Sequence, residues 1–313
     1  MTAVIGVVCA PDRSLGMPPR MPLAADFSRA PFLVIWEVTR ACALACVHCR
    51  ADAIPCRDPR ELSTAEGLAL VDQVCAFGDP APLLVLTGGD PMRRPDLATF
   101  VRYASQAGLT VALTPSGTAA ATKKRLAELG RGASLEQVTP EECERVLNYL
   151  YDLSLTSRFG VKTTEAPHYQ RVVRQREAQR ERDGLPSHAI ERRRQLRAPR
   201  SVNDGNGFVF IDHVGGICPS GFLPMVRGNV RSATLRDVYC DDEAFRRLRH
   251  ADGLRGNCGR CEFREVCGGS RSRSFASTGA LMGSDPLCVY DPGPEVRPVV
   301  PMFAPPITGS RSA

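Results

Sequence analysis

The stretch Arg40–Cys49, which reads RACALACVHC, follows directly after the apolar run Pro31–Trp36. An apolar run of this kind is typical of a strand buried in a parallel sheet, so the stretch is expected to form a loop at the carboxyl end of that strand. The loop carries three cysteines, with three and then two residues between them: Cys42, Cys46 and Cys49. We interpret it as a metal-binding loop.

Three thiolates cannot fill a 4Fe-4S cube, because each of its irons normally takes one cysteine. The iron left open can chelate a small molecule and pass it an electron. The loop therefore predicts a reactive metal site and not only a structural one. Zinc, or buried thiols without a metal, is the alternative. A structural zinc site would need a fourth nearby ligand, and only His48 stands within the loop.

The length and composition permit two modest domains with real cores in 313 residues. The net charge of +6 comes mainly from one arginine-rich segment and says little about partners. No secretory signal and no apolar run of membrane-spanning length is present, so we expect a cytoplasmic protein with no membrane partner. A reducing compartment favours metal or redox use of the cysteines over disulfides.

Strands and helices alternate after the cysteine loop. Ser63-Thr64-Ala65-Glu66 has the form of a capping box, and the apolar spacing behind it predicts a helix up to Phe77. A strand is predicted at Pro82–Leu86, a helix at Asp96–Ala107 and a third strand at Leu109–Leu113. This order predicts a parallel sheet.

Ligands of such sheets gather at the carboxyl ends of the strands. The turn Gly88-Gly89-Asp90 follows the second strand, and Ser116 lies in a turn after the third. Two glycines let backbone approach a ligand closely, and an acid after them can hold an ammonium group. Gly-Gly-Asp is also an ordinary tight turn, so the signal depends on its place behind the cysteines. Ser116 is a weaker candidate for ligand contact.

Cys42-x3-Cys46-x2-Cys49 after a strand resembles the signature of the radical S-adenosylmethionine (radical SAM) enzymes. The resemblance implies a 4Fe-4S cluster whose open iron binds S-adenosyl-L-methionine and breaks its sulfonium to give a 5'-deoxyadenosyl radical. It also implies a small electron donor such as flavodoxin or ferredoxin. The Gly88–Asp90 turn resembles the family's Gly-Gly-Glu motif, which holds the amino group of the cofactor. Asp90 is one methylene shorter than the usual glutamate.

The family's partial barrel has six strand-helix units, but no clear strand follows the predicted helix Ala119–Leu129. Instead Thr139-Pro140-Glu141-Glu142 begins another helix. We therefore expect an α/β fold, a partial (β/α) radical SAM barrel that is truncated by an internal deletion and followed by a small cysteine-rich cluster domain.

Four further cysteines form a full ligand set for one metal centre: Cys258, Cys261, Cys267 and Cys288. Spacing alone does not separate zinc from an iron-sulfur cluster. The pattern resembles the SPASM domain, which holds two auxiliary clusters, so the resemblance implies a second 4Fe-4S cluster on these four thiols. Arg271 and Ser220 stand where two ligands of the other cluster would be. Cys218 is expected to be a packed thiol, with a substitute ligand as the alternative.

The predicted domain organisation starts with an N-terminal extension and ends with a Pro-rich tail. Between them lie the barrel, an arginine-rich linker and the auxiliary-cluster domain, so the segments in order are 1–30, 31–165, 166–205, 206–290 and 291–313. The cluster domain is expected to open with a hairpin, Phe208–Ile211 with Ile217–Phe222, followed by a helix at Leu235–Leu248. The linker is interpreted as a solvated helix with mobile chain; its arginine-rich part, Arg171–Arg200, lacks interleaved aromatics, which argues against a nucleic-acid partner.

The function expected from these features is that of a radical SAM oxidoreductase that abstracts a substrate hydrogen. The resemblance implies a peptide or a tetrapyrrole precursor as the substrate. Two alternatives stay open at this point: a non-catalytic iron-sulfur protein that has lost cofactor binding through the deletion, and a zinc-stapled nucleic-acid-binding protein.

Overall fold

The computed structural model describes most of the chain and divides it by its contacts into two compact units. The described residues are 7–8, 26–44, 46, 49–114, 139–156, 160–161, 163, 166–185 and 202–299. The first unit comprises residues 1–3, 11–138 and 202–250, and the second 4–10, 139–201 and 251–313. Ser116, the predicted helix 119–129 and His48 lie outside the described residues.

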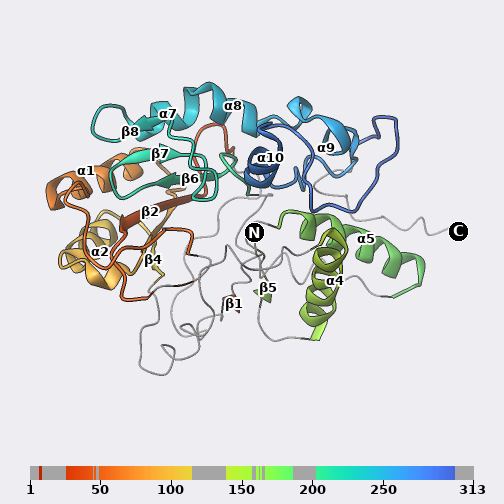
Figure 1. Cartoon of the computed structure of the whole chain (residues 1–313), viewed down its shortest axis with the longest axis horizontal. Coiled ribbons are helices and arrows are strands. Elements are labelled where there is room, and N and C mark those ends of the chain that lie inside the picture. Colours follow the sequence, from red (N-terminus) through yellow and green to blue (C-terminus); the bar gives the residue numbers. More distant parts are fainter. Residues whose placement is uncertain are drawn as a thin grey trace, which may run out of the picture. The chain divides into compact units, whose positions relative to one another are not determined.

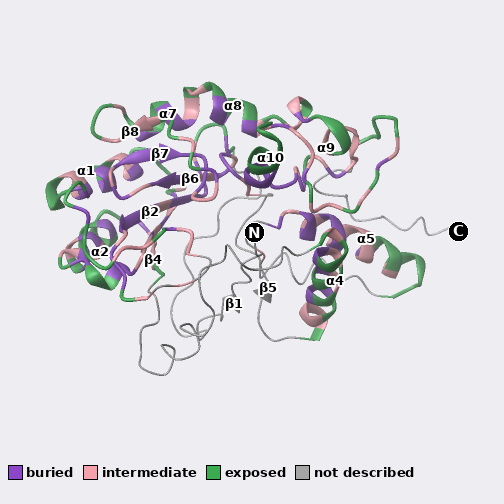
Figure 2. Ribbon diagram, in the orientation of Figure 1, coloured by how far each residue is buried: buried purple, intermediate pink, exposed green. Residues whose placement is uncertain are grey.

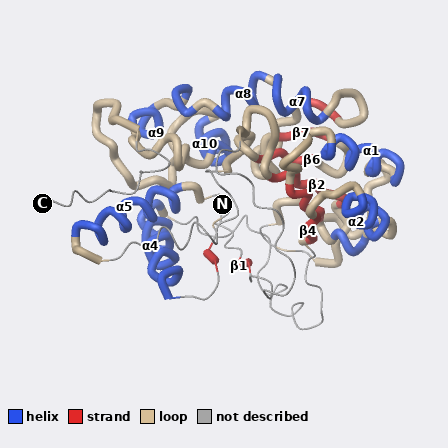
Figure 3. The backbone as a smooth tube through the Cα atoms, turned by 180° about the vertical axis from the view of Figure 1, so that it is seen from behind, coloured by secondary structure: helices blue, strands red, loops and turns tan. Residues whose placement is uncertain are grey.

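The first unit is built on a six-stranded sheet in the order β4-β3-β2-β6-β7-β8 (Figures 1 and 3). Its strands are β2 (Leu33–Thr39), β3 (Leu83–Gly88), β4 (Val111–Leu113), β6 (Phe208–Ile211), β7 (Gly216–Cys218) and β8 (Gly228–Asn229). The central strand β2 pairs in parallel with both β3 and β6, and β4 continues the parallel part beyond β3. β7 and β8 add antiparallel strands at the other edge. The fold is an open α/β sheet of the partial-barrel type expected.

The helices of this unit are α1 (Thr64–Cys75), the 3-10 turn η1 (Pro91–Arg93), α2 (Leu97–Gln106), α7 (Leu235–Asp241) and α8 (Glu243–Arg249). The four α-helices share one hydrophobic core with the sheet, and the strands at its centre are largely buried (Figure 2). Trp36, Phe100 and Tyr239 are fully buried in this core. The rings of Trp36 and Phe100 lie 4.9 Å apart between centroids. This core fixes the strand ends on which the cysteine loop is carried.

Local capping explains where several helices begin. The predicted capping box of α1 is present: Ser63 Oγ accepts from the Glu66 N–H at 3.3 Å, and Glu66 Oε2 accepts from the Ser63 N–H at 2.7 Å. The helix predicted at 235–248 is instead two helices. Asp242, in an extended conformation, ends α7 and caps α8 by accepting from the N–H of Ala244.

The predicted hairpin is confirmed in part and has a further role. β6 and β7 pair in antiparallel register, with Phe210 opposite Cys218. β6 also lies beside β2 in parallel register, with Leu33 opposite Phe208. The C-terminal segment therefore supplies the main sheet with a fourth parallel strand.

The second unit is mainly helical and contains α4 (Pro140–Thr156), α5 (His168–Arg182), η3 (Ala251–Gly253), α9 (Gly256–Arg260) and α10 (Arg271–Thr278), with the short antiparallel pair β1 (Val7–Val8) and β5 (Gly160–Val161). The expected start of α4 is confirmed, because the side chains of Thr139 and Glu142 exchange hydrogen bonds with each other's N–H groups. In the described part of the chain, none of the helices combines the length and apolar character needed to cross a bilayer.

The sequence predicted that the arginine-rich helix would be solvated, but α5 is partly buried. Its first turns are buried, including His168, Tyr169 and Arg171. Arg171 tolerates burial because its guanidinium donates to both carboxylate oxygens of Glu144 on α4. Part of the charge of this segment therefore belongs to a buried ion pair, and the rest lies at the surface.

Candidate functional site

The cysteine loop leaves the carboxyl end of β2 in the first unit. The N–H of Leu44 points to Cys42 Sγ and the N–H of Ala53 to Cys49 Sγ, each at 3.4 Å. The pKa of the Cys46 thiol is raised by burial, and the neighbouring Cys49 and Cys42 raise it further. The thiols of Cys42 and Cys49 therefore both lie within electrostatic reach of the Cys46 thiol.

The Gly-Gly-Asp turn is joined to the start of this loop by backbone hydrogen bonds. The N–H of Gly89 donates to Thr39 O at 2.9 Å, and the N–H of Asp90 donates to Ala41 O at 2.8 Å. A Cβ at Gly88 would lie 2.3 Å from Thr39 O, so a side chain there would clash with backbone. The glycines thus allow the turn to contact the cysteine loop itself, a role that the sequence did not reveal.

Asp90 is buried, with 3 % of its surface exposed. Its Oδ1 accepts from the N–H of Met92 at 3.1 Å and so caps the 3-10 turn η1. The carboxylate predicted to hold an ammonium group is therefore held rigidly at the carboxyl end of β3, beside the cysteine loop.

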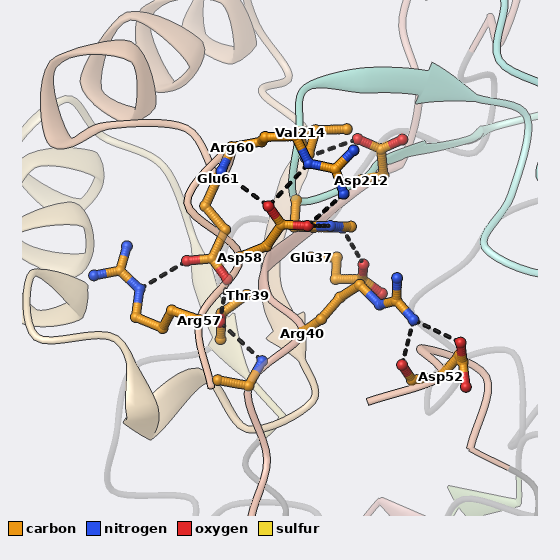
Figure 4. Close-up of polar contacts among 12 residues, drawn as sticks. Glu37, Thr39, Arg40, Asp52, Arg57, Asp58, Arg60, Glu61, Asp212 and Val214 are labelled. Atoms are coloured by element: carbon orange, nitrogen blue, oxygen red, sulfur yellow. Dashed lines mark hydrogen bonds and ion pairs between the residues drawn. The ribbon is translucent and has the colours of Figure 1, made fainter. Parts of the chain in front are cut away.

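A buried polar network surrounds the end of β2 (Figure 4). Glu37 Oε2 accepts from Arg50 Nη2 at 2.7 Å, and its Oε1 lies 3.1 Å from His213 Nδ1. The other ring nitrogen of His213 lies 3.5 Å from Asp58 Oδ2. Arg50 directly follows Cys49, so this network ties the last cysteine of the loop to β2 and to the end of β6.

The network changes the titration of its histidine. Burial lowers the pKa of His213, but the hydrogen bond and charge of Glu37 outweigh burial and raise the pKa above its ordinary value of 6.5. Sequence reasoning missed these residues. The available signal was a charged residue, Glu37, in an otherwise apolar strand directly before the cysteines.

The four C-terminal cysteines line one pocket of the second unit: Cys258, Cys261, Cys267 and Cys288. Backbone N–H groups point at their sulfurs, from Asp285 to Cys258 Sγ and from Phe263 to Cys261 Sγ, each at 3.4 Å. Such N–H···S contacts are usual around cysteine-bound iron-sulfur clusters. The donor set therefore fits a cluster bound by four thiolates.

Burial suppresses ionisation of three of these thiols, those of Cys261, Cys267 and Cys288. It raises the pKa of Cys261 to about 11 and also raises those of Cys267 and Cys288, with the charge of Cys258 adding to each rise. A metal takes the thiolate form, so loading a metal here releases protons and becomes more favourable as the pH rises.

Charged side chains are buried beside the same pocket. His168 Nε2 lies 2.7 Å from Asp285 Oδ2, and Arg273 Nη2 donates to the same oxygen at 2.8 Å. His168 and Arg171, both on α5, also line the pocket. His168 and Arg171 fall in the linker that the sequence predicted to be solvated, and Arg273 and Asp285 were assigned no role from the sequence.

The remaining predicted positions lie elsewhere. Cys218, on β7 in the first unit, is buried, and burial raises its pKa to about 12. Ser220 is buried and its Oγ accepts from the N–H groups of Phe222 and Leu223, so it serves a turn. Within the described ranges, no three His, Cys, Asp or Glu side chains are placed to hold one metal ion. A 4Fe-4S cluster does not require such convergence, because each thiolate binds a different iron.

Comparison with known proteins agrees with this geometry. The profile of the radical SAM superfamily matches residues 36–150. The AdoMet-dependent heme synthase of Oleidesulfovibrio alaskensis is 33 % identical over 85 % of this chain and 89 % of that protein. The chain belongs to the radical SAM superfamily. It is therefore an enzyme of the radical SAM class, a family that uses a 4Fe-4S cluster and S-adenosylmethionine.

One further relative and one solved structure are similar to this chain. The AdoMet-dependent heme synthase of Methanosarcina barkeri is 29 % identical over 85 % of this chain and 98 % of that protein. Streptococcus suis SuiB bound to S-adenosylmethionine shares the fold at 13 % identity, with a TM-score of 0.50 over 84 % of this chain and 78 % of that chain.

The radical SAM alignment also bears on the predicted shortening. The alignment with the Methanosarcina barkeri protein spans 349 residues, although only 85 % of this 313-residue chain takes part in it. The relative therefore carries sequence inside the aligned region that this chain lacks.

Proposed function

We propose that this radical SAM enzyme is an oxidoreductase that acts on a tetrapyrrole precursor of haem. In this proposal Cys42, Cys46 and Cys49 hold the cofactor-binding 4Fe-4S cluster, and the Gly88–Asp90 turn holds the amino group of S-adenosylmethionine. The substrate class is carried over from two relatives named AdoMet-dependent heme synthase, which align over most of the chain.

The observation that carries the proposal is the hydrogen-bonded union of the cysteine loop and the Gly-Gly-Asp turn. Three thiols and one buried carboxylate gather at adjacent carboxyl ends of β2 and β3. When bound, the cluster and its cofactor supply a radical that removes a substrate hydrogen. Ser116 is a further proposed cofactor contact.

The residues of the chain position these groups. Glu37 and Arg50 fix the end of the loop next to Cys49. The carboxylate of Asp90 offers a negative charge to an ammonium group in a buried setting, where such a hydrogen bond is stronger than in water. The four C-terminal cysteines hold a second, fully ligated 4Fe-4S cluster, which orders the unit and carries electrons. A small donor such as flavodoxin or ferredoxin supplies the reducing electron.

The test is anaerobic reconstitution with iron and sulfide, followed by reduction in the presence of S-adenosylmethionine. We expect formation of 5'-deoxyadenosine, which Cys46→Ala abolishes because one iron loses its thiolate. Cys56→Ala is the matched control, since Cys56 is an exposed thiol. Cleavage that continues unchanged in Cys46→Ala would falsify the assignment of the loop.

Substrate class is tested separately by supplying iron-bound and metal-free tetrapyrrole precursors and following their conversion by mass spectrometry. Turnover of a peptide but of no tetrapyrrole would exclude the proposed substrate and leave the radical chemistry in place. Intact clusters without affinity for S-adenosylmethionine would instead identify an iron-sulfur protein that lost its cofactor along with the missing barrel segment.

A further inference from the structure

A buried arginine lies against the cysteines of the second unit. Arg271 is the first residue of α10, and only 2 % of its surface is exposed. Its Nη2 donates to Cys258 Sγ over 3.7 Å. Its Nη1 donates to the carbonyl oxygens of Leu281 and Gly283 at 3.1 and 2.7 Å. These bonds fix the guanidinium beside a thiol of the pocket.

The surroundings of Arg271 differ from those of Arg171, the buried arginine that lines the pocket. Arg171 is neutralised by the carboxylate of Glu144. Arg271 instead bonds carbonyl oxygens and a thiol. A guanidinium stays charged in proteins, and a buried charge without a counter-charge is costly. A thiolate at Cys258, as in a bound cluster, supplies that counter-charge.

We propose that Arg271 raises the reduction potential of the auxiliary cluster held by Cys258, Cys261, Cys267 and Cys288. This inference rests on the proposed function in one respect, the presence of a cluster on these thiols. One-electron reduction adds a negative charge to the cluster and its ligands. A fixed cation and an N–H···S hydrogen bond both stabilise the reduced form.

The expected size of the effect follows from charge and distance. A unit charge a few ångströms from a buried site, where screening is weaker than in bulk water, changes an equilibrium constant by about tenfold or more. For a one-electron couple, tenfold corresponds to about 59 mV. Arg271 therefore acts as a positioning and potential-setting residue rather than a ligand.

The experiment measures the auxiliary cluster alone. In a full-length background of Cys42→Ser, Cys46→Ser and Cys49→Ser, the protein is reconstituted anaerobically, its iron and sulfide are counted, and its cluster is titrated by redox potentiometry with electron paramagnetic resonance. In that background, Arg271→Gln is expected to lower the equilibrium constant for reduction by about tenfold or more, which lowers the midpoint by about 59 mV or more.

Two further variants separate charge from other effects. Arg271→Lys keeps the charge without the fork and is expected to give an intermediate shift, roughly threefold. Arg264→Gln is the matched control: Arg264 lines the same pocket but is half-buried and donates to the carbonyl oxygens of Cys261 and Arg297. Its shift is expected to stay under about twofold.

An unchanged potential in Arg271→Gln, or an equal shift in Arg264→Gln, overturns the inference. If Arg271→Gln assembles no cluster, Arg271→Met, which also removes the charge, decides, because an unchanged potential in that variant overturns the inference. A background protein without iron and sulfide refutes the proposed cluster itself, and the inference with it. That result differs from a loaded cluster whose potential ignores Arg271.

Discussion

Glu37 faces Arg50 and His213 at the end of β2, and the histidine links the stability of the fold to pH. Arg50 bonds one carboxylate oxygen and His213 contacts the other. The folded state raises the pKa of His213, so the folded protein binds a proton more tightly than the unfolded chain does. Protonated His213 therefore stabilises the fold.

The first prediction concerns this pH dependence. The stabilisation by His213 is fully present below its unfolded pKa of about 6.5 and is lost as the pH rises through the raised folded pKa. The thermal unfolding midpoint of the apoprotein should therefore contain a component that falls as the pH rises above about 6.5 and through the raised pKa of His213. Glu37→Gln should remove this component because it removes the carboxylate that raises the pKa.

His213→Gln is the matched variant, since it removes the titrating ring and leaves Glu37 in place. Its unfolding midpoint should lack the same component over the same pH range. A wild-type slope in His213→Gln would show that another group causes the dependence. Resonances of His213, followed by nuclear magnetic resonance, give its pKa directly.

Residues that act on near neighbours in sequence could be predicted. The capping pairs of α1 and α4 were read from the sequence, because a cap contacts N–H groups only three residues away. The contact between Glu37 and His213 spans 176 positions and depends on the pairing of β2 with β6. No local pattern encodes such a pair.

At the scale of elements, the Gly88–Asp90 turn after β3 packs closely against the start of the cysteine loop. A Cβ at Gly89 would lie 2.5 Å from Arg40 O and 2.7 Å from Ala41 O. These are backbone atoms at the start of the loop, and they cannot move without moving the cysteines. The turn and the loop therefore behave as one element.

The second prediction is that Gly89→Ala disturbs both stability and metal loading. Overpacking of this kind costs about 1–3 kcal/mol, and the displaced loop should bind less iron at the first cluster. Urea unfolding and iron analysis measure the two effects. Gly253→Ala is the control, because a Cβ there meets only the flexible end of Met282 at 3.2 Å. Normal stability and iron content in Gly89→Ala would contradict the close fit.

Some of the helices and strands could be predicted from the sequence, and others could not. The strands and helices from β2 to β4 follow apolar periods and were predicted. α10 was not, because its residues RSRSFAST have no apolar period and become buried through hydrogen bonds instead. The position of β6 beside β2 was also missed, since strand pairing across a long stretch of chain leaves no local mark.

At the scale of the whole chain, the first unit and the region around the C-terminal cysteines differ in how much apolar surface they bury. The first unit has one extensive apolar core beneath its sheet. Around the C-terminal cysteines, the buried apolar cluster is small: Phe263, Val266 and Cys267. Short helices with so little apolar burial need another source of stability. The domain boundaries predicted from the sequence stay predictions; the contact units group residues 202–250 with the sheet and residues 139–201 with 251–313.

The third prediction follows from that difference. If a cluster on Cys258, Cys261, Cys267 and Cys288 supplies the missing stability, binding of metal and folding of this region are one event. Removal of iron by a chelator should expose residues 251–299 to limited proteolysis, while the sheet of the first unit stays protected. Mass spectrometry of the fragments locates the cuts.

The matched variants are Cys261→Ser with Cys267→Ser, which should be cut in the same region without chelator, and Cys56→Ser, which should behave as wild type because Cys56 is an exposed thiol. Equal protection of residues 251–299 with and without iron would mean that hydrogen bonds and ion pairs hold this region by themselves. The buried Asp285 would then be the leading cause, since it joins His168 on α5 to Arg273 on α10. Asp285→Asn would distinguish stabilisation by a bound cluster from stabilisation by the contacts of Asp285, because it weakens those contacts and leaves all four thiols in place.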